Sequence, residues 1–333
     1  MREVDSAAGP ANTRRRAVAA MSGTGRGVSE LAKRMGRGAA GSTFVTWDLH
    51  QQLRALWTLR DIRTRPPVLV YQFGKVGSMS IQRALERSGL GRRVVHVHLL
   101  SDVGLDLARR DCREAFRTTR QTKDDTGRVA ESLAVLHARS RAVNRYLAHR
   151  RWTGRVDVIT LVRDPIAREV SSYFQNLDRT DPGLARLVRA DPESSEVIER
   201  SLEAVSRQIC GLDPFEWFRD ELEAVFGVDV FAQGFDRHRG YDTYRSSDAN
   251  VLLIRYEDLH RVFDEAVKGF LGLPHVELQR RNVGEDKYYR TTYQAVKEAL
   301  ALPATERSRL YGSSDVRHFY SDDELEAFSR RWS

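Results

Sequence analysis

From residue 66 onward, short apolar runs alternate with stretches in which apolar residues recur every three or four positions. The runs have the length of buried strands, and the spacing between them is that of amphipathic helices. They lie at residues 68–73, 94–99, 156–162, 228–231 and 251–256. Strands that alternate with helices favour a parallel sheet covered by helices on both faces. We therefore predict an α/β fold with a doubly wound sheet, as a single domain over residues 66–333.

Helical spacing also marks the segment that precedes the first strand. Large apolar residues recur at intervals of mostly three or four residues from Phe44 onward, and Pro66 and Pro67 end the pattern. Residues 44–65 are therefore predicted to form an amphipathic helix that leads into the domain. Within the domain, the same spacing predicts helices at residues 78–87, 128–150, 166–177, 196–206, 215–226, 258–271 and 321–332.

The positive charge of the chain is concentrated near its start. The net charge is +8, and residues 1–65 alone contribute +7, from 12 Lys and Arg against 5 Asp and Glu. Residues 1–43 contain no aromatic residue, so they are predicted to form a flexible basic tail. This tail could be a solvated extension, a polyanion-binding arm or an organelle transit peptide. The nearly neutral remainder lacks the charge of a duplex-binding fold, so we expect no nucleic-acid partner.

Composition also limits the cellular setting and the metal chemistry. No stretch approaches the roughly 20 consecutive apolar residues of a membrane-spanning helix. The two cysteines, Cys112 and Cys210, cannot form a disulfide framework, and no cluster has structural zinc spacing. We expect a cytoplasmic protein with no membrane span.

Glu257 and Asp258 follow a predicted strand and could hold a metal, but we favour a helix cap at Asp258 and expect no metal site.

The turn after the first predicted strand combines glycines with a cation. Gly74, Lys75, Val76 and Gly77 precede a helix that is expected to begin at about Ser78. Glycines allow a tight turn, and the N–H groups of a helix N-terminus attract anions. Ligands of open α/β sheets bind at this edge, so the turn predicts an anion site. It is not a Walker motif, because Val76 follows the lysine, and a simple turn with a capping serine is the alternative.

A second motif follows the third predicted strand. Pro165 suits the first turn of a helix, so Arg163 is expected at the strand end and Ser171 about two turns into that helix. Arginine offers a planar fork for phosphate, and a serine hydroxyl adds a donor. Both side chains could bind one anion. An ordinary strand-to-helix junction with Arg163 in a salt bridge is the alternative.

The stretches Gln-Phe-Gly-Lys-Val-Gly-Ser-Met-Ser at residues 72–80 and Leu-Val-Arg-Asp-Pro-Ile-Ala-Arg-Glu-Val-Ser at residues 161–171 together resemble a known family. It comprises the sulfotransferases that use 3′-phosphoadenosine 5′-phosphosulfate. The eight-residue spacing from Arg163 to Ser171 is that of the family, and a weaker likeness continues at residues 252–259 and 319–321. The resemblance is closer to membrane-bound carbohydrate sulfotransferases and to bacterial enzymes linked to capsular polysaccharide than to the cytosolic aryl and steroid group.

The resemblance implies a P-loop-like fold in which the first loop binds the 5′-phosphosulfate of the donor and the second motif binds the 3′-phosphate. The implied donor-binding residues are Lys75, Gly77, Ser78, Met79, Ser80, Arg163 and Ser171. The Arg-Lys-Gly segment that completes the nucleotide clamp in the cytosolic group is missing from this chain. Residues 281–288 are a weak candidate for its substitute.

Sulfuryl transfer requires a cation at the leaving phosphate and a base for the acceptor hydroxyl. Lys75 is the candidate cation. His96 and His98 alternate onto one face near the end of the second predicted strand, and a neutral histidine can accept a proton near pH 7. Several family members place a catalytic histidine at this strand end. We therefore favour His98 as the base, with His96 and Asp102 as alternatives.

The resemblance, together with these residues, implies an O-sulfotransferase that uses 3′-phosphoadenosine 5′-phosphosulfate. The expected acceptor is a hydroxyl group of a glycan or a small molecule, contacted by residues 178–195 and 233–250. A nucleotide-dependent kinase of P-loop-like fold and a polyanion-binding protein that acts through the basic tail are the alternatives. Phe215, Trp217 and Phe218 are expected to form a packing face and not a sugar-binding platform. The identity of the acceptor and the oligomeric state do not follow from the sequence.

Overall fold

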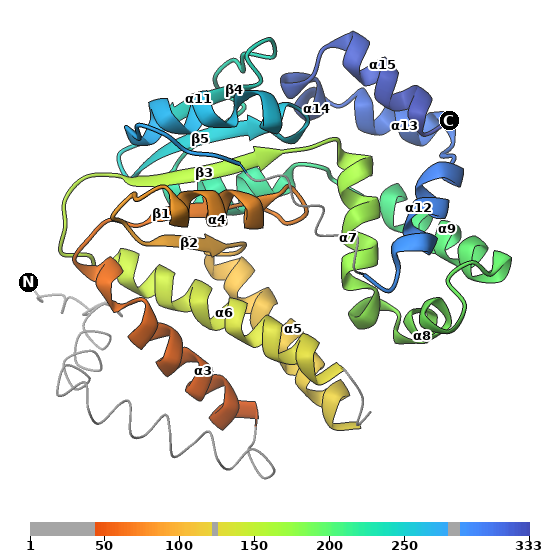
Figure 1. Cartoon of the computed structure of the whole chain (residues 1–333), viewed down its shortest axis with the longest axis horizontal. Coiled ribbons are helices and arrows are strands. Elements are labelled where there is room, and N and C mark those ends of the chain that lie inside the picture. The colour runs from red at the N-terminus through yellow and green to blue at the C-terminus, as the bar shows by residue number, and fades with distance from the viewer. Residues whose placement is uncertain (1–43, 122–125, 279–286) are drawn as a thin grey trace, which may run out of the picture.

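The computed structural model describes residues 44–121, 126–278 and 287–333, with the strands across the centre of the molecule and helices on both sides (Figure 1). The tail predicted for residues 1–43 lies outside the described residues. The same holds for residues 281–286 of the candidate clamp segment.

Five strands form one sheet in the described part of the chain. They are β1 (Val68–Tyr71), β2 (Val94–Val97), β3 (Val156–Val162), β4 (Tyr241–Arg245) and β5 (Ala249–Arg255). Their order is β2-β1-β3-β5-β4, in which all neighbours are parallel except the edge strand β4, which is antiparallel to β5. The predicted α/β class with a mostly parallel sheet and helices on both faces is confirmed.

The edge strand was not predicted, and one predicted strand is wrong. Residues 228–231 form no strand, because the Asp229 side chain accepts hydrogen bonds from the backbone N–H groups of Phe231 and Ala232 and bends the chain. β4 lies within residues 233–250, which were expected to be a loop. Its sequence Tyr-Asp-Thr-Tyr-Arg has no apolar run, since an edge strand is buried only in part.

The helices of the first half agree with the expected spacing except for one long addition. The first half contains α3 (Phe44–Thr58), a 3-10 turn η1 (Arg60–Arg63), α4 (Ser78–Arg87), α5 (Asp102–Gln121), α6 (Thr126–Ala148) and α7 (Pro165–Thr180). The sequence did not predict α5, which packs beside α6. Its composition is polar, with Leu105 and Cys112 among its few buried apolar residues.

The second half is largely helical around β4 and β5. It contains α8 (Pro182–Ala190), α9 (Ser195–Cys210), a π-helix η2 (Phe218–Glu223), α10 (Ala224–Phe226), η3 (Tyr256–Asp258), α11 (Leu259–Leu271), α12 (Arg290–Ala299), α13 (Ala304–Tyr311), α14 (Ser314–Phe319) and α15 (Asp322–Arg331). α8 occupies part of residues 178–195, where acceptor contacts had been expected in a loop. In the described part of the chain, no helix is long and apolar enough to cross a membrane.

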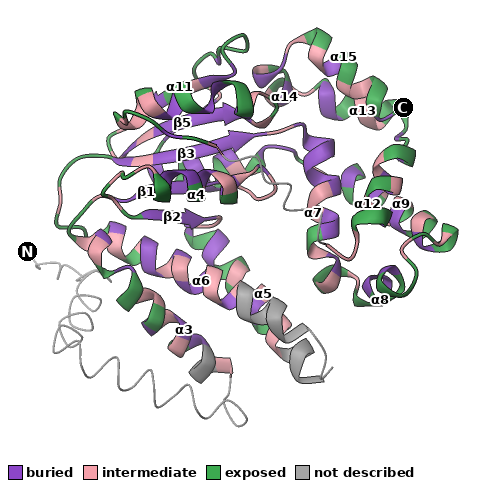
Figure 2. Cartoon of the chain, viewed as in Figure 1, coloured by how far each residue is buried: buried purple, intermediate pink, exposed green. Residues whose placement is uncertain are grey.

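Both faces of the sheet are buried, as Figure 2 shows for the strands. Val68 and Val70 of β1 pack with Leu85 of α4 and Phe263 of α11. The alternate side chains of β1 lie in the other core, with residues of α6, α7 and η2. The sheet edge formed by the ends of β1, β2 and β3 is thus held from both sides.

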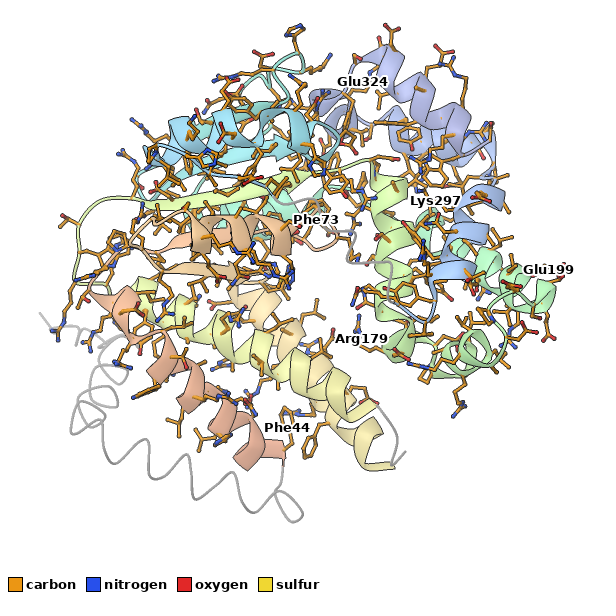
Figure 3. The ribbon with its side chains drawn as sticks, viewed as in Figure 1. Phe44, Phe73, Arg179, Glu199, Lys297 and Glu324 are labelled. Carbon is orange, nitrogen blue, oxygen red and sulfur yellow. The ribbon has the colours of Figure 1, made fainter. Side chains whose placement is uncertain are left out.

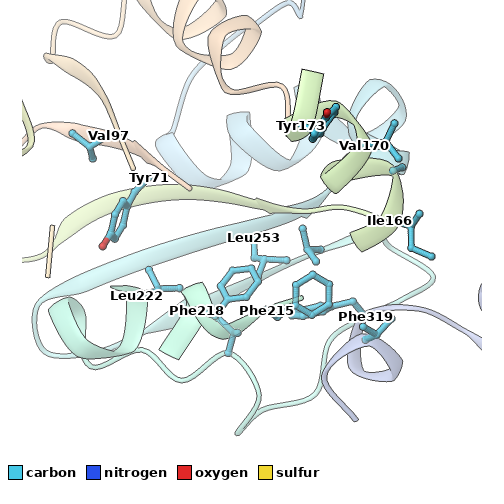
Figure 4. Close-up of a cluster of buried hydrophobic side chains, with 14 of the residues drawn as sticks. Tyr71, Val97, Ile166, Val170, Tyr173, Phe215, Phe218, Leu222, Leu253 and Phe319 are labelled. Atoms are coloured by element: carbon cyan, nitrogen blue, oxygen red, sulfur yellow. The ribbon is translucent and has the colours of Figure 1, made fainter. Parts of the chain in front are cut away.

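An aromatic cluster connects the second half of the chain to this sheet (Figure 4). Phe215 and Phe218 are fully buried, and their rings lie 5.5 and 5.9 Å from that of Phe319 in α14. The prediction that these two residues form a packing face is therefore confirmed. Trp217 is half-buried and contacts the strand ends, as described below.

Candidate functional site

The loop between β1 and α4 has an unusual backbone. Gly74, Lys75 and Gly77 have φ angles of 75°, 63° and 86°, and Lys75 is the one residue other than glycine with positive φ in the described part of the chain. A left-handed lysine is disfavoured, so the surrounding structure must hold it. Residues of this kind are concentrated at ligand sites.

The N-terminus of α4 offers hydrogen-bond donors. Among the described residues, the backbone N–H groups from Val76 to Met79 donate to no protein group, and Gly77 supplies no side-chain cap. The Ser78 side chain is buried, that of Ser80 is half-buried and that of Met79 is 44 % exposed. Such an array of amides, aided by the helix dipole, suits an anion.

The two motifs predicted to bind anions are in contact. Arg163, directly after β3, donates from Nη1 to the Lys75 carbonyl at 2.8 Å, and its guanidinium stacks 4.5 Å from the centre of the Tyr256 ring. Asp164 caps α7 by accepting the Ile166 N–H, so Pro165 begins the helix as expected. The structure therefore brings the first loop and Arg163 to one place at the carboxyl edge of the sheet.

Gln175 connects the face of α7 that carries Ser171 to the same loop. It lies one turn beyond Ser171 in α7, and its Oε1 accepts from Lys75 Nζ at 3.3 Å and also from Lys287 Nζ. Residues four apart share a helix face, so Ser171 faces the same side. Lys287 belongs to the candidate clamp segment and was not singled out by the sequence.

Several cations share this region without a carboxylate partner. Burial, then Lys287 and Arg163, lower the pKa of Lys75 to about 8. Burial also lowers the pKa of Lys287, and burial, Arg331 and Arg163 lower that of Lys297 on α12 (Figure 3). None of these lysines, nor Arg163, forms an ion pair in the described part of the chain. Like charges held together in this way favour an anionic ligand.

The two histidines of β2 and its end have different surroundings. His98 Nδ1 lies 2.6 Å from the Gln72 carbonyl, so Nδ1 carries the proton and Nε2 can accept one. His96 Nε2 lies 3.1 Å from Gln72 Nε2 and is thus occupied. Burial lowers the pKa of His98, and burial together with His98 lowers that of His96 to about 3. Both rings are therefore neutral near pH 7.

The geometry separates the three base candidates. The His98 ring lies against the loop after β1, since a Cβ on Gly74 would be 4.0 Å from His98 Cε1. Asp102 is exposed as the first residue of α5. Gln72 was missed as a functional residue, although its place two residues beyond the buried Val70 puts it on the face of β1 that neighbours the histidines.

Acidic residues near the strand ends have structural partners. Glu257 accepts from the Asp164 N–H at 2.9 Å and from the Tyr320 hydroxyl at 3.0 Å. Asp258 occupies the N-cap position of α11 as predicted, but its side chain makes no capping hydrogen bond and pairs with Arg255 and Arg261 instead. The described residues hold no group of three or more histidine, cysteine, aspartate or glutamate side chains that could bind a metal ion.

A family model described as "Putative capsular polysaccharide synthesis protein" matches residues 200–321. No curated protein and no solved structure matches the chain. The matched region includes the π-helix η2, strands β4 and β5, and Lys287 and Lys297. The loop after β1 and the Arg163 motif lie outside it. Over residues 200–321, the chain is thus similar to a family whose description concerns capsular polysaccharide synthesis.

Proposed function

We propose that this protein transfers a sulfuryl group from 3′-phosphoadenosine 5′-phosphosulfate to a hydroxyl group of a carbohydrate. The observation that carries the proposal is the junction of two phosphate-type motifs through the Arg163–Lys75 hydrogen bond, within a group of cations that lack carboxylate partners. A nucleotide with anionic groups at both its 5′ and 3′ positions matches that charge.

The two ends of the donor are assigned to different residues. The amides at the start of α4, with Lys75, would hold the phosphosulfate, since a helix N-terminus and a lysine both favour negative charge. Arg163 and Ser171 would hold the 3′-phosphate. Lys297 lies close enough to Arg163 for the arginine to lower the pKa of Lys297. This assignment is supported by the eight-residue spacing and by the face of α7 that carries Gln175.

The chemistry uses two further properties of the site. The acceptor oxygen forms a bond to sulfur while the bond from sulfur to the bridging phosphate oxygen breaks. The acceptor proton passes to Nε2 of His98, which is available because Nδ1–H donates to the Gln72 carbonyl. Lys75 stabilises the charge that develops on the leaving phosphate.

The carbohydrate acceptor rests on the family match over residues 200–321. The description of that family concerns capsular polysaccharide, so a polysaccharide or its precursor is the acceptor to test first. A kinase is less favoured, because the residue after Lys75 is the fully buried Val76, which has no side-chain hydroxyl to bind a magnesium ion.

Nucleotide binding tests the proposal without a known acceptor. We expect 3′-phosphoadenosine 5′-phosphate to bind at least tenfold more tightly than AMP or ATP with Mg²⁺ in calorimetry, and to raise Tm, since a ligand at 100 times its Kd stabilises by about 2.7 kcal/mol. Arg163→Ala should remove the preference over AMP. Arg155→Ala, an exposed arginine just before β3, is the matched control.

The alternatives predict other outcomes. Preference for ATP with Mg²⁺ would indicate a kinase. Heparin binding that disappears on deletion of residues 1–43, with no nucleotide binding, would indicate a polyanion-binding protein. Equal affinity for AMP and the bisphosphate would overturn the assignment of Arg163 and Ser171.

A further inference from the structure

A buried carboxylate of the π-helix η2 reaches the ends of β1 and β2. Glu221 is 2 % exposed, and it accepts four hydrogen bonds. The donors are the Tyr71 hydroxyl, the Leu100 N–H at 2.6 Å, the Ser101 N–H at 2.9 Å and the Ser101 hydroxyl at 2.7 Å. One side chain thus joins β1 to the turn that follows β2.

Trp217, four residues before Glu221, contacts the same two strand ends. Its Nε1–H donates to the His98 carbonyl at 2.9 Å. Its ring centre lies 4.7 Å from that of Tyr71 and 5.8 Å from that of Phe73. The indole therefore fixes the backbone of the candidate base and packs against the residue before Gly74.

These contacts enclose His98 and its partner. The carbonyl of Gln72 accepts the proton of His98 Nδ1, and Gln72 directly follows Tyr71. Leu100 follows His98 by two residues. Each flank of the His98–Gln72 pair is consequently held by η2 or by the tryptophan just before it.

A packing role alone would not require a carboxylate here. A buried charge is costly to desolvate, and apolar residues of similar volume often stabilise a core as well or better. The surrounding chain also makes room for the carboxylate, because a Cβ on Gly104 would lie 1.9 Å from Glu221 Oε1. A carboxylate, unlike an apolar side chain, offers directional acceptor sites for these four fixed donors.

We infer that Glu221 and Trp217 are positioning residues that hold His98 as the Nδ1–H tautomer, with Nε2 directed to the acceptor hydroxyl. The inference rests on the proposed function for the role of His98, whereas the tautomer itself can be measured without any substrate. It also gives the region matched by the family model a part in the chemistry, although that region contains neither anion motif.

The test is two-bond ¹H–¹⁵N NMR of the full chain labelled at histidine, with the His98 signals identified by their loss in His98→Gln. The wild type should show the Nδ1–H tautomer alone at pH 7.5. In Glu221→Gln and Trp217→Phe, we expect a mixture of tautomers and a pKa of His98 closer to 6.5. The Kd for 3′-phosphoadenosine 5′-phosphate should change less than threefold, because the donor loop keeps Lys75 and Arg163.

Val205→Ala is the control for lost stability, since Val205 is a fully buried residue of α9 and takes no part in the hydrogen bonds of Glu221, Trp217 or His98. It should lower Tm and leave the tautomer unchanged.

If Glu221→Gln fails to fold, Ser101→Ala removes one of the four donors and should shift the tautomer in the same direction. An unchanged His98 tautomer in every folded variant would overturn the inference. Absence of nucleotide binding by the wild type would instead overturn the proposed donor and leave the tautomer result intact.

Discussion

Lys75 carries two energetic costs in the protein without a ligand. Its backbone occupies the left-handed region, and its ammonium group is partly desolvated beside Lys287 and Arg163. A bound anion offsets the second cost, because it replaces repulsion between cations with attraction. Ligand binding and protonation of Lys75 are therefore linked.

This linkage predicts proton uptake when the nucleotide binds. The pKa of Lys75 is about 8 without a ligand and should rise beside a phosphate, so binding at pH 8 takes up protons and affinity falls as the pH rises above 8. Calorimetry in two buffers of different ionisation enthalpy measures the uptake. Lys75→Arg, which stays protonated, should reduce it strongly. Equal heats in both buffers for the wild type would contradict the prediction.

Lys75 and His98 should differ in what their removal changes. Lys75→Ala should weaken nucleotide binding and lower turnover by about a hundredfold or more, since the cation holds the donor and stabilises the leaving group. His98→Ala should lower the rate by about 10² to 10⁴ and leave nucleotide affinity intact. The measurements are calorimetry and single-turnover sulfation with a capsular polysaccharide acceptor. Normal turnover in His98→Ala would move the base elsewhere.

At the scale of elements, the close contact of the β1–α4 loop with η3, which follows β5, makes Gly77 sensitive to substitution. A Cβ there would lie 3.2 Å from the Tyr256 ring, which also stacks on Arg163. Gly77→Ala should cost about 1–2 kcal/mol in backbone strain and also displace this ring. We expect a lower Tm and at least tenfold weaker nucleotide binding.

Gly89, which follows α4, supplies a matched control for Gly77. It also has positive φ, at 71°, but a Cβ there would meet no atom within 4 Å. Gly89→Ala should therefore lower Tm through strain alone and leave nucleotide affinity unchanged. If both variants weaken nucleotide binding equally, displacement of the Tyr256 ring does not explain the loss of affinity in Gly77→Ala.

The sequence predicted the strands that are apolar along most of their length and the helices that have one apolar face. β1 is a continuous apolar run, and β3 is apolar except for Asp157 and Thr160, because both faces of a parallel strand are buried. α4 begins at Ser78 and ends at Arg87 as expected, because one face of the helix is buried. The polar helix α5 and the edge strand β4 lack such a signature. Residues 228–231 have the composition of a strand, but the Asp229 side chain accepts the Phe231 N–H and turns the chain there.

The main candidate site residues could be predicted because they follow strands. Lys75, His98 and Arg163 each stand just beyond a strand end, and the carboxyl edge of a parallel sheet brings such positions together. Gln175 and Lys287 reach the site from far along the chain, and Glu221 acts from a π-helix. Their contacts depend on tertiary packing, which no local pattern contains.

At the scale of the molecule, buried histidines should govern acid stability. Burial first lowers the pKa of His137 from 6.5 to about 4; Asp48 and Asp106 raise it, and Arg141 and Arg109 lower it. The unfolded chain therefore binds the proton at a higher pH, and stability falls as pH drops from 6.5 towards 4, by at most about 1.4 kcal/mol per pH unit for this group.

The expected consequence is that His137→Leu stabilises the protein in acid. Both ring nitrogens of His137 lack a hydrogen-bond partner among the described residues, so leucine removes no bond. Urea unfolding at pH 7.5 and pH 5 should show a smaller loss of free energy of unfolding in the variant than in the wild type. An equal loss in both proteins would show that other groups set the acid limit.

Trp332 has a consequence for how the protein is made. This fully buried residue donates from Nε1 to Asp164, the cap of the helix that carries Ser171, although 168 positions separate the two. Because chains emerge from the ribosome starting at the N-terminus, the Arg163 motif is translated long before the residue that secures it. Nascent chains should therefore acquire nucleotide affinity only after residue 332 has emerged.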